Sequence, residues 1–178
     1  MEAAVEAERS PSFHDRFVEL FDAHFKRIYR YLNRMSGDPE LAADVAQEAF
    51  VNLYRRGSLP DSPEAWLISV AMNLLRNAAT TRSRRLRLLT PARGERVLGD
   101  PPPSPDEAVE AEDSRRRVRS ALDRMPERER RMLLLRAEGY SYRDIAAALH
   151  LNEASVGVLL ARAKRAFRDI YEESSGAP

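Results

Sequence analysis

Residues 139–165 decide the fold of this chain, and they form the sequence GYSYRDIAAALHLNEASVGVLLARAKR. Gly139 is placed to end one helix, because glycine readily adopts the left-handed backbone conformation found just after many helices. Ser141 predicts the N-cap of the next helix, and Asp144 stands three residues later, where it completes a capping box. A short turn follows, and Asn152 predicts the cap of a second helix. The spacing therefore predicts a helix-turn-helix.

The second of these helices has two different sides. An apolar stripe recurs at helical spacing and predicts the buried side: Val156, Leu160, Ala163 and Phe167. The opposite side carries small and basic residues: Ala154, Ser155, Val158, Ala161, Arg162 and Arg165. Such a helix fits the major groove of DNA. The same pattern also occurs in a helical hairpin with a solvated basic face, so the pattern alone leaves both interpretations open.

The composition excludes several classes of protein. The 178 residues suffice for one ordinary domain or two small ones. The net charge of +1 means that any nucleic-acid surface requires local segregation of charge. The absence of Cys excludes disulfides and thiolate metal sites and suits a reducing cytosol. The three histidines show no metal-ligand spacing, so we predict no metal and no cofactor. No signal peptide or membrane span is apparent, which predicts a cytoplasmic protein without membrane contact.

The N-terminal half predicts a helical bundle that follows a disordered tail at residues 1–11. Apolar residues at helical spacing predict a first helix from Ser12 to about Met35. Asp38 and Pro39 then predict the cap and first turn of a second helix, which reaches about Arg55. Its buried side is formed by Ala42, Val45, Ala46, Ala49, Phe50 and Leu53. Its polar side carries Asp44, Gln47 and Glu48 together with Val51. A polar side of this kind is usually just solvated.

A third helix follows a loop predicted at residues 55–61. Ser62 and Pro63 predict its start, and one stripe of the helix is apolar: Leu67, Ala71, Leu74 and Ala78. A second stripe combines an aromatic residue with two amides: Trp66, Val70, Asn73 and Asn77. Such a surface is able to stack on a base and to form hydrogen bonds with its edge. The alternative is that Trp66 belongs to the core and that the asparagines have no special role.

An arginine cluster favours the nucleic-acid interpretation. Residues 76–93 contain six arginines and no acidic residue: Arg76, Arg82, Arg84, Arg85, Arg87 and Arg93. A concentrated basic segment on a nearly neutral chain is typical of a phosphate-binding surface. The helical bundle is predicted to cover residues 12–90. A flexible proline-rich linker follows at residues 91–106.

The second half predicts another small helical module over residues 107–172, followed by a polar tail at 173–178. One helix is expected to run from about Asp106 to Arg124 with Val109, Val118, Ala121 and Leu122 facing inward. A further helix begins near Pro126, and the helix-turn-helix completes the module. The chain is therefore predicted to be all-α, with two small helical domains and no strand. Because the linker is flexible, we expect the two modules to move independently unless a partner clamps them together.

This arrangement resembles the extracytoplasmic-function (ECF) sigma factors of bacterial RNA polymerase over roughly residues 13–171. Each motif is weak singly, but their order and spacing together are specific. The first module carries Asp44, Gln47-Glu48 and Phe50, then Trp66-Leu67 and Ala71-x-Asn73. The second module carries Leu122, Met125-Pro126-Glu127-Arg128 and Arg130, then Tyr140-Ser141-Tyr142, Asp144-Ile145-Ala146, Ser155-Val156 and Arg162-Ala163. The resemblance implies sigma region 2 in the first module and sigma region 4 in the second.

The resemblance also implies roles for individual residues. The residues implied to dock on the β′ clamp helices of core RNA polymerase are Asp44, Gln47, Glu48 and Val51. Those implied to bind and open the minus-ten promoter element are Arg55, Arg56, Trp66, Asn73, Arg76, Asn77, Arg82, Arg84 and Arg85, with the loop at 55–61 helping to hold an unstacked base. Those implied to recognise the minus-thirty-five element, with the module near the β flap, are Arg143, Glu153, Ala154, Ser155, Val158, Arg162 and Arg165. An anti-sigma factor is implied as a further partner.

One departure from the family pattern affects the recognition helix. Gly157, Val158 and Leu159 stand where the family often has basic or polar residues. Direct hydrogen bonding to bases is therefore expected to be sparse. Phosphate contacts from Arg162, Arg165 and Arg168, together with DNA shape, are expected to contribute more.

Two other functions were weighed against a transcription initiation factor. A sigma-like decoy that only binds an anti-sigma factor needs no DNA contacts, which the arginine cluster and the recognition helix argue against. A stand-alone helix-turn-helix regulator does not need the polar face formed by Asp44, Gln47 and Glu48, so the presence of that face argues against it. An enzyme is disfavoured because no nucleophile-base pair or phosphate-binding glycine loop is apparent, and no small-molecule substrate is predicted. The sequence does not specify the promoter, the regulon or the inducing signal.

Overall fold

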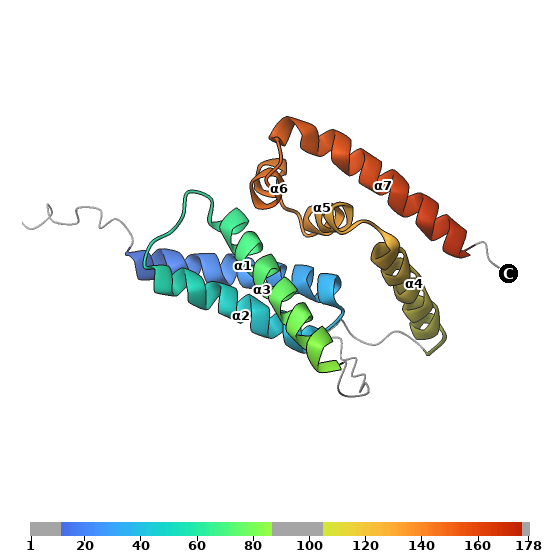
Figure 1. The fold of residues 1–178 in the computed structure, drawn as a ribbon, viewed down its shortest axis with the longest axis horizontal. Helices are drawn as coiled ribbons and strands as arrows, with labels where there is room; N and C mark the ends of the chain where they lie inside the picture. Colours follow the sequence, from blue (N-terminus) through green and yellow to red (C-terminus); the bar gives the residue numbers. More distant parts are fainter. Residues whose placement is uncertain (1–11, 87–104, 176–178) are drawn as a thin grey trace, which may run out of the picture.

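The computed structural model describes residues 12–86 and 105–175, and these residues form seven helices and no strand. This confirms the all-α prediction. The helices are α1 (Phe13–Ser36), α2 (Pro39–Arg56), α3 (Pro63–Leu86), α4 (Pro105–Arg124), α5 (Glu127–Ala137), α6 (Tyr142–Leu149) and α7 (Glu153–Ser175). Figure 1 shows α1, α2 and α3 in one group and α4 to α7 in a second. The tail at 1–11 and most of the predicted linker lie outside the described residues.

The helix boundaries of the first module follow from its capping residues. Ser12 accepts a hydrogen bond from the backbone N–H of Asp15, whose carboxylate accepts from the N–H of Ser12 in return. Gly37, with φ of 69°, ends α1 in the left-handed conformation. Asp38 then caps α2 through a 3.1 Å bond from the N–H of Leu41. The predicted start of α2 at Pro39 is confirmed.

The first module is a three-helix bundle whose core contains the predicted stripe of α2. Ala42, Ala46 and Leu53 are fully buried there. Rings from α1 pack against Phe50 of α2, with centroids 5.0 Å from Phe21 and 5.8 Å from Phe25. Ring pairs at this spacing add to the stability that area burial provides. The predicted stripe of α3 is also inward, with Leu67 and Ala71 fully buried.

The second module places α7 across α5 and α6, and α4 packs against α7. Arg124 of α4 forms a 2.9 Å ion pair with Glu173 near the end of α7. Ala121 is fully buried, as predicted, but Val118 is 36% exposed, so its predicted inward position was wrong. The error arose because α4 contacts its neighbours along a narrower strip than the apolar pattern suggested.

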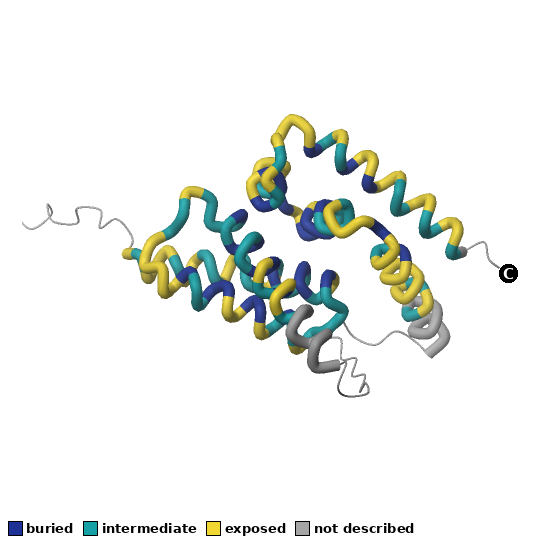
Figure 2. The backbone as a smooth tube through the Cα atoms, in the orientation of Figure 1, coloured by how far each residue is buried: buried dark blue, intermediate teal, exposed yellow. Residues whose placement is uncertain are grey.

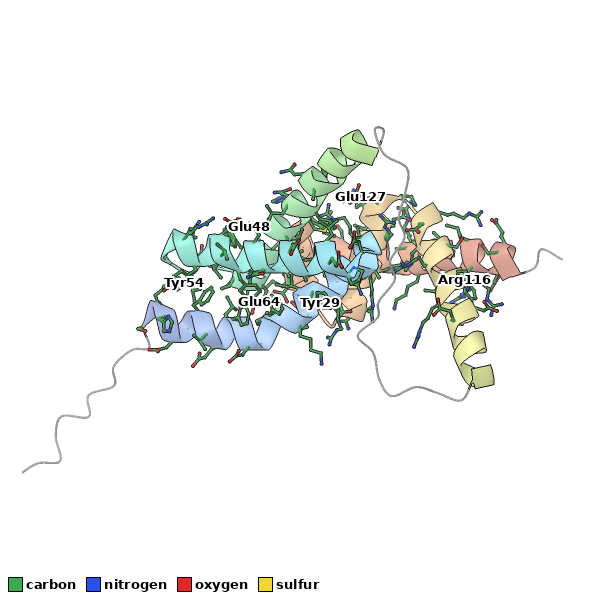
Figure 3. The ribbon with its side chains drawn as sticks, turned by 90° about the horizontal axis from the view of Figure 1, so that it is seen from below. Tyr29, Glu48, Tyr54, Glu64, Arg116 and Glu127 are labelled. Carbon is green, nitrogen blue, oxygen red and sulfur yellow. The ribbon has the colours of Figure 1, made fainter. Side chains whose placement is uncertain are left out.

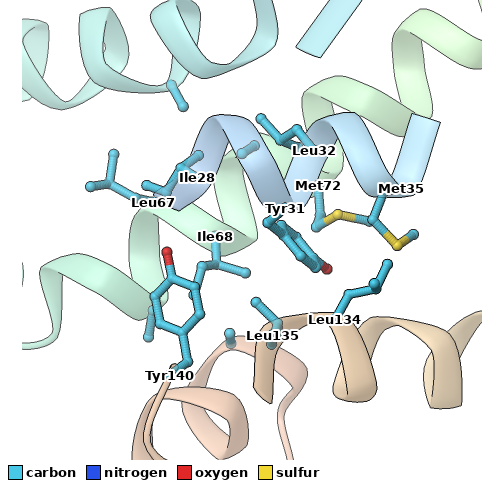
Figure 4. Close-up of a cluster of buried hydrophobic side chains, with 14 of the residues drawn as sticks. Ile28, Tyr31, Leu32, Met35, Leu67, Ile68, Met72, Leu134, Leu135 and Tyr140 are labelled. Carbon is cyan, nitrogen blue, oxygen red and sulfur yellow. The ribbon is translucent and has the colours of Figure 1, made fainter. Parts of the chain in front are cut away.

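The two modules share one hydrophobic core, so the expectation that they behave independently was wrong for this structure. The contacts join α1 to α5 and α3 to α6. Tyr31 of α1 points toward Leu135 of α5, and both are fully buried in the cluster that Figure 4 shows. Ile68 and Met72 of α3 belong to the same cluster. Figure 2 shows buried residues on the sides of the two groups that face each other.

Two helices extend beyond the boundaries expected from the sequence. α4 begins at Pro105, so the last two residues of the predicted linker at 91–106 are helical. α7 continues to Ser175, and the domain end predicted at residue 172 therefore lies inside a helix. No single helix among the described residues is long and apolar enough to cross a membrane.

Candidate functional site

The helix-turn-helix is formed by α6 and α7, whose axes meet at 92°. This value lies in the range of about 90–120° found in helix-turn-helix motifs. Ser141 and Asp144 form the predicted capping box, with a 3.1 Å bond from the N–H of Asp144 to the Ser141 hydroxyl. His150 takes a left-handed conformation with φ of 54° between the helices. Asn152 caps α7 by accepting a 3.0 Å bond from the N–H of Ala154.

The face of α7 predicted to contact DNA is open to solvent. Val156, Leu160 and Ala163 are buried on the opposite side, and Phe167 is half-buried. The exposed residues are Glu153, Ala154, Ser155, Val158, Arg162 and Arg165. Val158 is 65% exposed. Arg143 of α6 is also exposed. The structure thus brings the predicted minus-thirty-five residues to one accessible region of the helix-turn-helix.

Gly157 lies inside α7, at a position where no turn requires a glycine. A Cβ atom at this position meets the Tyr142 ring at 3.5 Å, which is ordinary van der Waals contact. Alanine therefore fits at this position without a clash. Glycine is then a cost of roughly 1 kcal/mol to the helix rather than a steric requirement.

The polar face of α2 is a second accessible surface. Asp44, Gln47 and Glu48 are exposed, whereas Val51 is half-buried. Glu48 forms a 3.5 Å ion pair with Arg55, about two turns further along the same face of α2. Figure 3 shows Glu48 and Tyr54 on this helix. The predicted docking residues therefore lie beside an arginine that was assigned to the minus-ten group.

Three of the residues predicted to bind the minus-ten element, Arg55, Arg56 and Trp66, lie where α2 ends and α3 begins. Arg55 and Arg56 belong to the last turn of α2, so the loop predicted at 55–61 is shorter and begins at Gly57. The guanidinium of Arg56 lies 6.0 Å from the centre of the half-buried Trp66 ring. That distance is at the outer limit of a cation–π contact. The Trp66 ring and the Arg56 cation therefore lie next to each other at the junction of α2 and α3.

The amides of α3 continue this surface along the helix. Asn73, Arg76 and Asn77 are all exposed, and Arg76 donates a 3.4 Å bond to the Asn73 side chain. Arg76 also lies 3.7 Å from Glu127 at the start of α5, which Figure 3 labels. An acid of the second module is thus paired with a predicted minus-ten residue. Arg82, Arg84 and Arg85 fall in the last turns of α3, where the side chains lie outside the description.

Buried titratable groups line the region between the modules. Burial raises the pKa of Tyr31 to about 12, and burial likewise raises the pKa of Tyr140. The pKa of His24 is lowered because burial penalises its charged form, although Glu64 at 3.4 Å opposes the shift. All three groups are therefore uncharged near neutral pH.

A charged cluster that no sequence motif predicted joins the two modules. Glu138 follows α5, and its side chain is only 2% exposed. It forms ion pairs with Arg30 and Arg34 of α1, at 2.8 Å and 2.6 Å. Arg27, Arg30 and Arg34 stand at helical spacing on one side of α1, and this basic stripe is a sequence signal from which an acidic partner could have been expected. No comparable pattern marks Glu138 itself.

Comparisons with known proteins agree with the geometry of both modules. Residues 20–85 match the family described as Sigma-70 region 2, and residues 115–167 match Sigma-70, region 4. The ECF RNA polymerase sigma factor SigL of Mycobacterium tuberculosis is 30% identical over 160 residues, covering 86% of this chain and 88% of SigL. The RNA polymerase sigma-H factor of Pseudomonas aeruginosa is 32% identical over 152 residues, covering 79% and 78%.

Other relatives differ in length or in closeness. The ECF RNA polymerase sigma factor SigE of Mycolicibacterium smegmatis is 29% identical over 160 residues, which cover 88% of this chain but 62% of SigE. The chain thus spans less than two thirds of that relative. Among solved structures, the sigma factor RpoE in complex with the anti-sigma factor NepR from Bartonella quintana is similar, with a TM-score of 0.62. It is 18% identical, covering 88% of this chain and 97% of that chain, and therefore supports the fold.

Proposed function

The chain belongs to the ECF family of RNA polymerase sigma factors, and from this premise we propose that it binds core RNA polymerase, directs it to specific promoters and helps to open the DNA. In this role it is a specificity subunit and not an enzyme, and it acts in the cytoplasm with the polymerase. The observation that carries the proposal is the presence of three separate exposed surfaces on one chain. They lie on α2, on the face of α3 that bears Trp66, and on α7.

The α2 surface is proposed to dock on the β′ clamp helices. Asp44, Gln47 and Glu48 present two acids and an amide to solvent, which suits a basic or polar partner. Val51 is half-buried at the same face and offers a small apolar contact. A contact surface with charged residues around a small apolar area is typical of a protein–protein interface that associates and dissociates reversibly.

The surface around Trp66 is proposed to capture the opened minus-ten strand. The ring can stack on a base, and Arg56 and Asn73 offer a cation and an amide near it. Stacking on an aromatic side chain contributes about 1–3 kcal/mol per base. Arg76, Asn77 and the arginines at 82, 84 and 85 follow along α3 and are proposed to contact phosphates, and Arg55 adds charge at the end of α2. Capture of an unpaired base draws the duplex open.

The helix-turn-helix is proposed to recognise the minus-thirty-five element while the module sits near the β flap. Ser155 and Glu153 are the polar side chains near the start of α7, where major-groove contacts concentrate. Val158 and Ala154 can contact thymine methyl groups. Arg143, Arg162 and Arg165 are placed for phosphates, which fix the orientation of the module on the duplex.

An anti-sigma factor is proposed as a regulatory partner. The support is the likeness to the sigma factor RpoE, whose solved structure is a complex with the anti-sigma factor NepR. That likeness extends over both modules and includes 88% of this chain.

Run-off transcription tests the proposed function. Bacterial core RNA polymerase is mixed with a pool of genomic promoter fragments, with and without this protein. We expect new discrete transcripts only when the protein is present, and their upstream sequences then define both promoter elements. Absence of transcripts together with absence of core binding contradicts the proposal and favours the stand-alone regulator or the decoy.

A further inference from the structure

The exposed side of the recognition helix α7 carries few groups that can form hydrogen bonds. Side chains three and four positions apart are neighbours on one face of a helix. Around Val158 these neighbours are Ala154, Ser155, Ala161 and Arg162, and all of them are exposed. The two alanine side chains neither donate nor accept a hydrogen bond. Readout of base edges by hydrogen bonds therefore depends, around Val158, on one hydroxyl and one guanidinium.

Val158 is the largest apolar group on this side of α7. It is 65% exposed, whereas Val156 and Leu160 are buried in the core of the module. Ala154 and Ala161 beside it are short, so the methyl groups of Val158 are accessible to a surface that approaches the helix. The χ1 angle of a β-branched residue in a helix is almost fixed, so a contact through Val158 immobilises little that was free. The valine is thus a preformed apolar contact point.

Basic side chains of α7 lie close enough to Val158 to contact the edge of the same groove. Arg162 and Arg165 follow Val158 by four and seven positions and are exposed, which places them about 6 and 10 Å further along the helix axis. The major groove of B-DNA is about 12 Å wide. Arg162 and Arg165 can therefore reach phosphates while Val158 lies over base edges. Phosphate contacts fix the position of the helix but do not distinguish sequences, so the sequence preference depends on Val158 and its neighbours.

Thymine is the base whose edge in the major groove presents a methyl group, at C5. Contact between that methyl group and Val158 removes apolar surface of both partners from water, which is favourable. Burial of one methyl-sized group contributes about a fourfold change in affinity. Over cytosine, the same valine covers the N4 amino group and gives it no acceptor, which is unfavourable. Val158 therefore favours thymine over cytosine at the contacted position.

We propose that this chain identifies its DNA site through the C5-methyl group of a pyrimidine that contacts Val158, while hydrogen bonds to base edges have a minor part. The inference rests on the proposed function, because it assumes that α7 enters the major groove of the minus-thirty-five element. It adds the chemical class of the ligand, which is a pyrimidine methylated at C5. 5-Methylcytosine carries its methyl group at the same place as thymine, so it replaces thymine better than unmodified cytosine does.

Removal of a single methyl group from the DNA tests the proposal. Binding sites are selected from a pool of random duplexes by the full-length chain, both alone and assembled with core RNA polymerase. Each thymine of the enriched element (the upstream one when two are enriched) is then replaced by deoxyuridine, which lacks only the methyl group. We expect one replacement to lower the affinity about fourfold, and replacements outside the enriched sequences to leave it unchanged. An enriched element without thymine, or equal affinity for all deoxyuridine duplexes, would overturn the proposal.

Cytosine provides the complementary test at the thymine identified in this way. A C·G pair is placed there, with unmodified cytosine in one duplex and 5-methylcytosine in another. We expect the methylated duplex to bind about fourfold more tightly. Both duplexes have the same hydrogen-bonding groups, so a difference arises from the methyl group. Equal affinities would contradict recognition through a methyl group.

Truncation of Val158 shows whether this residue makes the contact. In Val158→Ala, we expect the thymine and deoxyuridine duplexes to bind equally, because the partner of the methyl group is missing. A residue with only a structural role would weaken both complexes by the same factor. Val118→Ala is the matched control, since Val118 of α4 is also exposed and lies outside α7, and it is expected to retain the fourfold preference. A preference for thymine that persists in Val158→Ala would overturn the assignment.

The outcomes distinguish this inference from the proposed function. If run-off transcription succeeds but no deoxyuridine replacement alters binding, the proposed function stands and recognition through a methyl group fails. If run-off transcription fails but the selected duplexes still lose affinity with deoxyuridine, the proposed function fails and recognition through a methyl group stands. If neither the chain nor its complex with polymerase enriches any sequence, both are overturned.

Discussion

At the scale of single residues, Trp66 is the side chain on which the proposed melting activity depends most. We expect Trp66→Ala to spare binding to core polymerase and to slow promoter opening by about 5- to 100-fold, the equivalent of roughly 1–3 kcal/mol of lost stacking. Permanganate reactivity of thymines in the opened region measures the rate. The α2 surface is separate from this ring, which is why polymerase binding is expected to persist.

The control for this prediction is Trp66→Phe, which keeps a ring at the same position. Because Trp66 also packs against the core, thermal unfolding of both variants is compared first. Phenylalanine is expected to recover most of the opening rate. Thymine reactivity that is the same in Trp66→Ala and in the wild type would remove Trp66 from the melting surface.

His24 predicts how stability depends on pH. Burial lowers the pKa of His24 in the folded chain from the ordinary value of 6.5. Below about pH 6.5, the unfolded chain therefore binds a proton that the folded chain does not, and stability decreases as the pH falls. Urea unfolding at pH 7.5 and pH 5.5 should show a larger loss of unfolding free energy in the wild type than in His24→Gln. Equal losses in the two proteins would show that His24 does not contribute.

Capping residues were predictable from the sequence, but the charged cluster between the modules was not. Ser141, Asp144 and Asn152 act within four positions of their partners, so local spacing is sufficient to identify them. Glu138 pairs with residues more than 100 positions away. A glutamate that follows an arginine-rich helix has the sequence context of a solvated residue. Only the packing of two modules turns it into a buried one.

At the scale of helices, α6 is short enough for one cap to matter. It has eight residues, and the Ser141 hydroxyl accepts a bond from the backbone N–H of Asp144 in its first turn. We expect Ser141→Ala to lower the free energy of unfolding by about 1 kcal/mol. The matched control is Ser12→Ala, which removes the same capping box from the 24-residue α1. Loss of the Ser12 cap disorders only one exposed turn of α1. The free energy of unfolding measured by chemical denaturation is therefore expected to decrease less in Ser12→Ala than in Ser141→Ala. A larger effect of Ser12→Ala would contradict this account.

The α2 surface gives a functional prediction at the same scale. Gln47→Ala with Glu48→Ala removes two exposed side chains without touching the core. We expect affinity for core polymerase to fall by about tenfold or more, since the loss of interface anchors commonly costs over 1 kcal/mol. Fluorescence anisotropy with labelled protein measures it. Asp22→Ala, an exposed acid on α1, is the control for charge alone. Unaltered affinity of the double variant would exclude this face from docking.

The helix α3 has a second buried side that its sequence pattern did not predict. The stripe predicted to be inward, which includes Leu67 and Ala71, is indeed buried in the first module. Ile68, Met72 and Leu75 are also buried, and they lie on another side of the helix. Apolar residues surround most of α3, so periodicity identifies no single core side. The additional side is where the helix-turn-helix packs.

At the scale of the whole molecule, the shared core couples the stability of the two modules. Leu135 of α5 is fully buried in the cluster that also contains Tyr31 and Ile68. A linker rich in proline was a poor guide to this coupling, because it limits only how far apart the modules can move. What brings them together is complementary apolar and charged surface, which depends on tertiary structure.

The coupling predicts one cooperative unfolding transition for the free protein. The single tryptophan, Trp66, lies in the first module and reports its unfolding by fluorescence. We expect Leu135→Ala, in the second module, to lower the free energy of unfolding by about 2–5 kcal/mol, and to shift the Trp66 fluorescence transition and the far-UV circular dichroism transition together. Val158→Ala, at a site 65% exposed, should shift neither. The contrary result is a Leu135→Ala variant whose Trp66 fluorescence transition matches that of the wild type, while part of its circular dichroism signal is lost under milder conditions. That result would mean that the modules unfold separately.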